Sequence, residues 1–204
     1  MNNQEMLTLI KSLGIKLTED IKNSSDVYTQ PGSITYLLNG PQISKQSISI
    51  KYGKVGELIF INMIKSNDNI ELLKCGCHII DDGKKKDLDL LWADHNLKII
   101  YYREAKGNIE MDTEKIPAMI SKINNEIKGY VTNKYPEYSI DIGVLSWSVY
   151  SRSILKKGLS HIKKIEGKGI KVDHFSDFLN LVNIDWSEED FYDYFRKLGV
   201  ILDN

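Results

Sequence analysis

Glu104 and Lys106 stand two residues apart at the end of a stretch, residues 99–106, that is rich in β-forming side chains. Side chains two apart in a strand point to the same side, about 6.5–7 Å from one another along it. The carboxylate and the ammonium group can therefore act together on one bound phosphate or water. Ala105, between them, points to the opposite side of the strand.

Two further acids, Asp87 and Asp89, lie in the apolar stretch that precedes this one, residues 87–92. As a single strand it would place both acids and Leu91 on one face. A hairpin turn at 94–96 would then bring one of the aspartates beside Glu104. Two carboxylates held close raise each other's pKa, and a cation relieves this. A divalent metal such as Mg²⁺, which takes oxygen ligands and also binds phosphates, would supply that cation.

Asp89 followed by Glu104-Ala105-Lys106 resembles the PD-(D/E)XK nuclease superfamily, in which an aspartate on one strand precedes Glu-x-Lys on the next. The proline of that name is absent, and Lys86 or Leu88 stands in its place. Asp89 is preferred over Asp87, because the two apolar residues after it look closer to the superfamily pattern. If the register of the strands differs, Asp87 takes its place.

The resemblance implies an α/β fold with a restriction-endonuclease-like core, a mixed sheet of about four to five strands flanked by helices in the order αβββαβ. Residues 52–64 look like the first core helix, which in this superfamily often carries a glutamate near the metal, here Glu57. At this length the chain looks most like a type II restriction endonuclease, a site-specific deoxyribonuclease that cuts double-stranded DNA.

The same resemblance implies the roles of the site residues. Asp89, Glu104 and the carbonyl of Ala105 would hold Mg²⁺, with Mn²⁺ as a substitute. Lys106 would orient or deprotonate the attacking water. Glu57 would hold a second metal or its waters. A palindromic DNA site would call for a homodimer.

The sequence is also compatible with other functions. A DNA repair or junction-resolving nuclease of the same superfamily would share every catalytic residue, and an RNA-directed nuclease is a further possibility. In a different class, the chain is a non-enzymatic nucleic-acid-binding module. Its acids and Lys106 would then form the solvated face of an ordinary hairpin.

Composition narrows these choices. The 204-residue chain is 42% hydrophobic, enough for a folded core, and has a net charge of −1. It holds no apolar run long enough for a membrane span and no signal-peptide core, so we expect a cytoplasmic protein. It also holds no P-loop, so we expect no use of ATP. Cys75 and Cys77 share a face of the strand expected at 72–80. Without a second Cys/His pair they predict buried free thiols rather than a zinc site.

Positive charge is concentrated in two places. Residues 151–171 hold seven Lys/Arg against one Glu, whereas residues 172–204 hold eight Asp/Glu against two Lys/Arg. A second basic run, Lys84, Lys85 and Lys86, directly precedes the acidic stretch. We expect these three lysines and Arg152 to contact DNA phosphates, although a solvated lysine face would look the same.

The remaining segments are expected to build a single domain, 1–204. Residues 1–50 would form one or two short helices, interrupted at Gly14, and polar loops; 51–150 the catalytic core; and 151–204 the basic segment and terminal helices. Four isoleucines at helical spacing predict a helix that packs on the sheet, with its cap near Asp112. They are Ile116, Ile120, Ile123 and Ile127.

Three elements are expected after that helix. Residues 139–150 read as a strand with Ser146, Ser148, Tyr150 and Arg152 on one polar face. Residues 176–182 and 187–198 read as helices, the second capped by Ser187 and ended by Gly199.

Overall fold

The structure, a computed structural model, describes residues 3–23, 37–38, 45–80, 83–107, 109, 115–155 and 158–203. The chain forms two compact units. The first is Phe60–Trp186, and the second combines Asn2–Ile59 with Ser187–Asn204. The expected cap at Asp112 and most of the polar loop segment 23–49 lie outside the described residues. The single-domain organisation stays a prediction.

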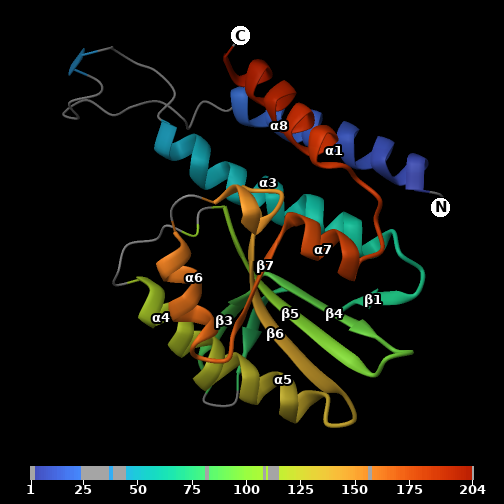
Figure 1. Ribbon diagram of the computed structural model, residues 1–204, viewed down its shortest axis with the longest axis vertical. Coiled ribbons are helices and arrows are strands. Elements are labelled where there is room, and N and C mark those ends of the chain that lie inside the picture. Colours follow the sequence, from blue (N-terminus) through green and yellow to red (C-terminus); the bar gives the residue numbers. More distant parts are fainter. Residues whose placement is uncertain are drawn as a thin grey trace. The chain divides into compact units, whose positions relative to one another are not determined.

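A mixed five-stranded sheet forms the centre of the first unit, in the order β1-β4-β5-β6-β7 (Figure 1). β1 and β5 pair antiparallel with β4, whereas β6 runs parallel to β5 and β7 parallel to β6. The expectation of a mixed α/β fold with a sheet of this size is confirmed. The strands are β1 (Ile70–Leu72), β4 (Leu90–Asp94), β5 (Ile99–Lys106), β6 (Ser139–Ser146) and β7 (Lys171–His174).

A separate two-stranded sheet interrupts this order. β2 (Gly76–Ile79) and β3 (Lys85–Leu88) pair antiparallel with each other and not with the central sheet. The single strand expected at 72–80 is wrong, because the chain breaks between β1 and β2, where Gly76 adopts a φ of +83° that suits glycine. Both cysteines are free, but Cys77 is exposed and Cys75 half-buried, so the expectation of two buried thiols is wrong.

The single strand expected at 87–92 is wrong as well. It divides into β3 and β4, and Asp89 occupies the bend between them. Asp87 and Asp89 therefore do not share one continuous strand face. Asp87 is exposed on β3 of the small sheet, whereas Asp89 is half-buried at the start of β4.

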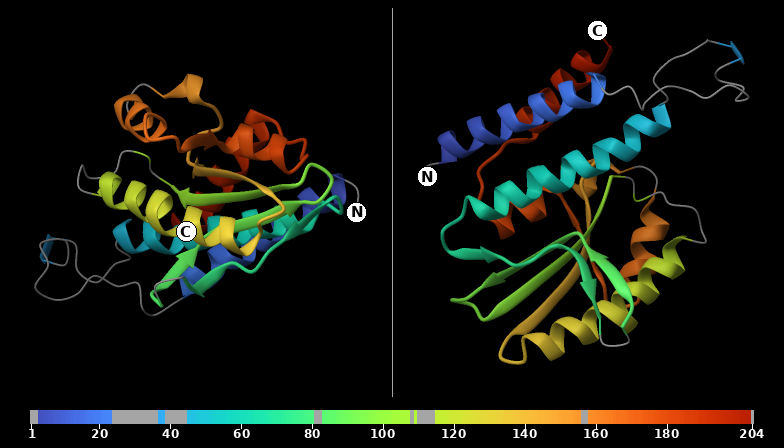
Figure 2. Two further views of the ribbon diagram at one scale, coloured as in Figure 1. Left: turned by 90° about the horizontal axis from the view of Figure 1, so that it is seen from below. Right: turned by 180° about the vertical axis from the view of Figure 1, so that it is seen from behind.

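One face of the central sheet packs against three consecutive helical segments, α4 (Lys115–Ser121), a π-helical segment (Lys122–Ile127) and α5 (Lys128–Lys134). Figure 2 shows the three as one nearly continuous rod. The predicted isoleucine stripe is confirmed, with Ile120 partly buried and the other three fully buried in the same core cluster. α6 (Leu159–Glu166) adds Ile162 and Ile165 to this cluster.

The opposite face of the sheet carries aromatic side chains. Trp92 points away from its neighbours Leu91 and Ala93, and its ring lies 5.9 Å from that of Phe178 in α7 (Phe175–Leu181). Phe60, near the end of α3 (Lys45–Lys65), packs against Phe178 at 5.3 Å. The sheet of the first unit is therefore covered by helices on both faces.

The C-terminal part of the first unit departs from expectation. β6 ends at Ser146, so the strand expected to continue to Tyr150 is too long. Arg152 lies in a short 3-10 helix, Arg152–Ile154, rather than on a polar strand face. The basic segment, 151–171, contains α6 and ends at the first residue of the edge strand β7. Both elements are short and only partly buried, and neither was predicted from the sequence.

The second unit consists of α1 (Asn3–Asn23), the first part of α3 and α8 (Glu188–Asp203). α1 runs through Gly14 without interruption. The glycine lets Tyr194 of α8 approach the helix, since a Cβ there would clash with the tyrosine oxygen. The Tyr194 hydroxyl donates to the carbonyl of Ile10 at 3.1 Å. Ser187 accepts the N–H of Asp190, which confirms the predicted cap, but α8 passes through Gly199, so the expected end there is wrong.

Among the described helices, none is both long and apolar enough to cross a membrane.

Candidate active site

The register of β4 against β5 brings an aspartate beside Glu104. Leu90 pairs with Arg103, so Asp89, one residue earlier, lies level with Glu104. One carboxylate oxygen of Asp89 accepts the backbone N–H of Ala105 at 2.9 Å. The predicted hairpin and the convergence of Asp89 with Glu104 are therefore present in the structure, with Asp89 in a bend rather than in a strand.

Glu104 is buried, with only 5% of its surface exposed. Its two carboxylate oxygens are divided among three donors. Lys106 reaches Oε1 at 2.9 Å, while Lys122 and the hydroxyl of Tyr102 reach Oε2 at 2.7 and 2.5 Å. Because Glu104 is so deeply buried and so fully bonded, the interpretation of this stretch as a solvated hairpin face is wrong for this residue.

The two carboxylates respond differently to their surroundings. Burial and then the charge of Glu104 raise the pKa of Asp89 to about 7. Burial also acts to raise the pKa of Glu104, but the charges of Lys106 and Lys122 outweigh it and hold that pKa below its usual value. One acid is thus ionised and neutralised, and the other titrates near neutrality.

Tyr102 and Lys122 were not singled out by the sequence. Tyr102 is two residues before Glu104 on the same strand face, so the alternation that joins Glu104 to Lys106 could have indicated it. Lys122 lies 18 residues after Glu104 and opens the π-helical segment. No local pattern marks that contact, which depends on how the helix lies across the sheet.

The divalent-metal hypothesis can be tested against the donor set. Among the described residues, no group of three or more His, Cys, Asp or Glu side chains gathers at a point that could hold a metal. The candidate ligands are two carboxylates, Asp89 and Glu104, and the carbonyl of Ala105. Since Mg²⁺ often takes only one or two carboxylates and completes its shell with water and phosphate oxygens, this set fits such an ion. The raised pKa of Asp89 fits it also, because a bound cation would favour the ionised carboxylate.

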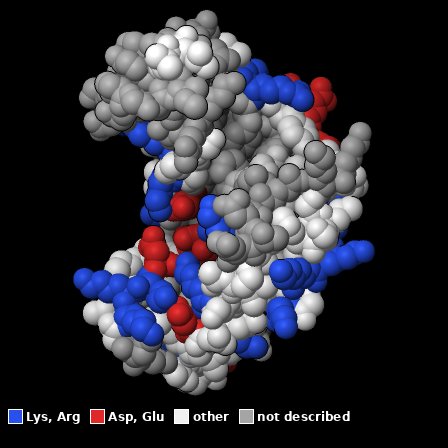
Figure 3. Space-filling view, turned by 90° about the vertical axis from the view of Figure 1, so that its left-hand side faces the viewer, with Lys and Arg blue, Asp and Glu red and all other residues white. Residues whose placement is uncertain are grey.

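The other expected site residues are distributed as follows. Glu57 belongs to the second unit, where Lys54 donates to its carboxylate at 2.8 Å. Lys86 pairs with Glu126 at 2.6 Å, while Lys84 and Lys85 lie on the exposed side of β3 and the turn before it. On the face drawn in Figure 3, Lys and Arg side chains lie beside acidic ones.

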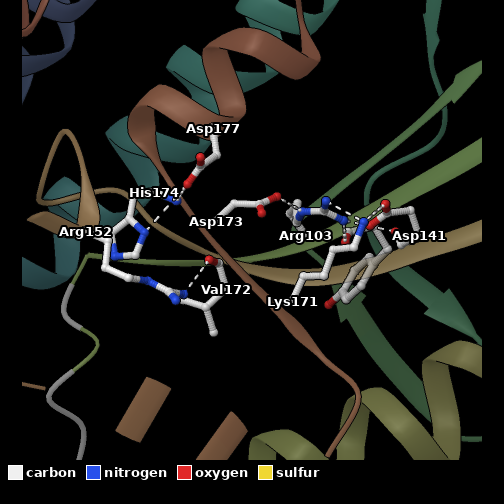
Figure 4. Close-up of polar contacts among 9 residues, drawn as sticks. Arg103, Asp141, Arg152, Lys171, Val172, Asp173, His174 and Asp177 are labelled. Carbon is white, nitrogen blue, oxygen red and sulfur yellow. Dashed lines mark hydrogen bonds and ion pairs between the residues drawn. The ribbon is translucent and has the colours of Figure 1, made fainter. Parts of the chain in front are cut away.

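Arg152 is committed to partners inside the protein. It pairs with Glu166 at 2.5 Å and donates to the carbonyl of Val172 at 3.3 Å (Figure 4). Its role as a DNA contact stays a prediction, as do those of the three lysines.

The opposite face of β5 carries a second buried charge cluster (Figure 4). Arg103 is 1% exposed, and its guanidinium contacts Asp173 of β7 at 2.6 Å and Asp141 of β6 at 2.9 Å. It also donates to two backbone carbonyls. Lys171 pairs with Asp141 from the surface. Gly143 makes room for the arginine, since a Cβ there would lie 2.9 Å from its Nε.

Polar side chains continue across the carboxyl ends of the three parallel strands. Lys106 is in register with Ser146 of β6, which is in register with His174 of β7. Ser146 and His174 are each 1% exposed. Within the described part of the chain, neither the Ser146 hydroxyl nor Nε2 of His174 has a hydrogen-bond partner. The ends of parallel strands in open α/β sheets are common places for ligand sites.

No protein-family model matches the chain, and no curated protein matches it either. Among solved structures, the chain is similar to Can2 from Sulfobacillus thermosulfidooxidans in complex with cyclic tetra-adenylate (cA4). The TM-score is 0.42 at 16% sequence identity, covering 89% of this chain and 51% of that one. The chain therefore spans about half the length of that structure, and a likeness at this level identifies no family.

Proposed function

We propose that the protein is a metal-dependent nuclease of the PD-(D/E)XK type. The observation that carries the proposal is the convergence of Asp89, in the bend before β4, with Glu104 of β5, and the bond of Lys106 to Glu104 on the same face. The element order supports it. Leaving out the β2–β3 hairpin, the chain runs α3, β1, β4, β5, α4 to α5 and β6, which is the expected order αβββαβ. The last two strands in that order, β5 and β6, are parallel.

The proposed roles follow from the contacts. Asp89, Glu104 and the carbonyl of Ala105 would hold the divalent cation, Mg²⁺ or Mn²⁺, which when bound polarises a phosphate and acidifies a coordinated water. Lys106, already directed at the Glu104 carboxylate, would orient that water or accept its proton. Lys122 and Tyr102 would fix the orientation of Glu104. Their bonds leave the carboxylate little freedom to rotate.

We propose double-stranded DNA as the substrate and site-specific cutting by a homodimer, as in a type II restriction endonuclease. The lysines that precede the site, Lys84 and Lys85, would contact the DNA backbone. The repair or junction-resolving alternative shares the same chemistry, so the choice of substrate in the assay decides between them.

The test is digestion of a mixed-sequence plasmid with Mg²⁺, with and without chelator. We expect discrete fragments that disappear with chelator, and a loss of at least about a hundredfold in rate for Glu104→Gln and Lys106→Ala. Asp87→Asn is the matched control for Asp89→Asn, because it removes an exposed aspartate two residues away. Cutting retained by Glu104→Gln, or no metal-dependent cutting of any duplex by the wild type, contradicts the proposal. A smear, or cutting confined to branched DNA, favours a non-specific or repair nuclease.

A further inference from the structure

A pocket of about 300 Å³ lies between α6 and the helical rod that carries Lys122. Its volume is at the lower end of the range for small-molecule sites. One wall comes from α4 and the π-helical segment, and the other from α6 and the turn that follows it. The lining residues are Pro117, Ile120, Ser121, Asn124, Asn125, Lys164 and Lys168.

The pocket carries positive charge that no described carboxylate neutralises. Among the described residues that line it, none is acidic, and neither Lys164 nor Lys168 forms an ion pair within the described part of the chain. Three other lysines of this unit, Lys86, Lys122 and Lys171, each pair with a carboxylate. Two uncompensated ammonium groups at one pocket favour an anion.

The lysines alone would not make a site. Lysines in the last turn of a helix also offset the partial negative charge of its carbonyl groups, and Lys163 can do this as well as Lys164. What distinguishes Lys164 and Lys168 is that both line the pocket, together with groups suited to the rest of a ligand.

Those groups are two amides and an apolar surface. Asn124 donates one amide N–H to the carbonyl of Lys168 at 3.1 Å, and Asn125 donates one to the hydroxyl of Ser121 at 3.1 Å. Each amide keeps its carbonyl oxygen and a second N–H for another partner. Side-chain amides can pair with the edge of a nucleobase, and Pro117 together with Ile120 offers an apolar surface for a flat ring.

The wall that carries the amides has unusual backbone geometry. Asn124 and Asn125 lie in the π-helical segment Lys122–Ile127, whose first residue bonds to Glu104. π-helical turns are rare and occur often at functional sites. The same segment therefore reaches the acids with Lys122 and presents two adjacent amides to the pocket.

We propose that this pocket binds a nucleoside phosphate, either as a free nucleotide or as one residue of a nucleic-acid strand. The phosphate lies between Lys164 and Lys168. The base lies against Pro117 and pairs with the free amide groups of Asn124 and Asn125. The binding does not depend on the proposed cleavage reaction.

The test is equilibrium binding by fluorescence anisotropy, in chelator so that no cleavage occurs. The probes are a labelled adenosine monophosphate and a labelled short single strand of DNA. We expect Lys164→Ala/Lys168→Ala to weaken binding about tenfold, and to lower the salt dependence for the strand by about one to two phosphate contacts. Lys163→Ala, which removes one charge from α6 outside the pocket lining, serves as the control and should alter binding less than about twofold.

The two sources of the ligand give different results. Saturable binding of the mononucleotide that the double variant weakens identifies a free-nucleotide site, whereas binding of the strand alone identifies a strand contact. Competition by inorganic phosphate that equals competition by the nucleotide overturns the nucleoside part of the proposal. No binding of either probe, or equal weakening by Lys163→Ala, overturns it entirely. All three lysines are exposed, and matching thermal unfolding curves would show that the variants fold.

Discussion

Arg103 and Glu104 are neighbours on β5, point to opposite faces of the sheet, and each lies at the centre of a buried charge cluster. Around Arg103, two carboxylates and Lys171 balance the guanidinium, and all of the groups pair directly. Burial acts to raise the pKa of Asp141, but Arg103 and Lys171 hold it below its usual value. This cluster joins three strands and is electrostatically complete.

The Glu104 cluster has the same count of charges but a different outcome. Both lysines pair with Glu104, and among the described residues none pairs with Asp89, which accepts only a backbone N–H. Its raised pKa is the result. The number of charges therefore does not separate a structural cluster from a candidate active site. The difference is one carboxylate that lacks a cation.

The largest expected loss of stability is at the Arg103 cluster. Arg103→Met would leave Asp141 and Asp173, both partly buried, without their guanidinium, at a cost of about 3 kcal/mol in the free energy of unfolding. Urea denaturation measures it. Lys171→Met removes a cation from the same Asp141, but its side chain is 63% exposed, so we expect a loss below about 1 kcal/mol. If the two variants lost similar amounts of stability, the buried Arg103 would contribute no more than the exposed Lys171.

The next effect is the pH dependence of stability set by Asp89. The pKa of Asp89 is about 7 in the folded protein, against 3.8 for an unperturbed aspartate. Between these two pH values the folded state therefore binds more protons than the unfolded state. The contribution of Asp89 to stability is present at low pH and is lost as the pH rises through this window, by up to about 1.4 kcal/mol per pH unit.

Asp89→Asn should remove that slope and make the protein more stable than wild type above about pH 7, by up to about 4 kcal/mol. Unfolding curves in chelator across this pH range measure it, with Asp87→Asn as the control that keeps the slope. An unchanged slope in Asp89→Asn would show that the carboxylate is not held in the protonated form.

A smaller effect is expected at Lys122, whose contact with Glu104 the sequence did not predict. Lys122→Met removes a donor from Glu104, so the pKa of Glu104 should rise and stability should fall by about 1–2 kcal/mol. Lys128→Met, at an exposed position six residues later in the same rod, should change stability by less than about 0.5 kcal/mol. Urea denaturation of the two variants side by side decides whether the Lys122 contact contributes. Equal values would mean that it does not.

The smallest effect is expected at Ser146. Its hydroxyl is buried without a partner among the described residues, so removing it releases a polar group that gains nothing from its position. Ser146→Ala should be within about 0.5 kcal/mol of wild type or slightly more stable. A clear loss of stability, measured by thermal unfolding, would mean that the hydroxyl is bonded after all.

Local patterns predicted the residues that lie close in sequence. Period-2 alternation placed Glu104 and Lys106 on one face, and helical spacing placed the isoleucine stripe on the sheet. Long-range pairing was beyond such patterns. Lys122 meets Glu104 across 18 residues and Arg103 meets Asp173 across 70. Nor did the apolar run at 72–80 reveal its break before β2, because one apolar run can contribute strands to two different sheets without a change in composition.

The central claim is that Asp89 and Glu104 form the place where the protein accepts a divalent cation. Calorimetric titration of Mg²⁺ or Mn²⁺ into the wild type and into Asp89→Asn, Glu104→Gln and Asp87→Asn, at a pH above about 7 where Asp89 is ionised, tests it directly. We predict saturable binding by the wild type and by Asp87→Asn, and its loss in Asp89→Asn and Glu104→Gln. Undiminished binding in Asp89→Asn, or no binding by the wild type, would contradict the claim.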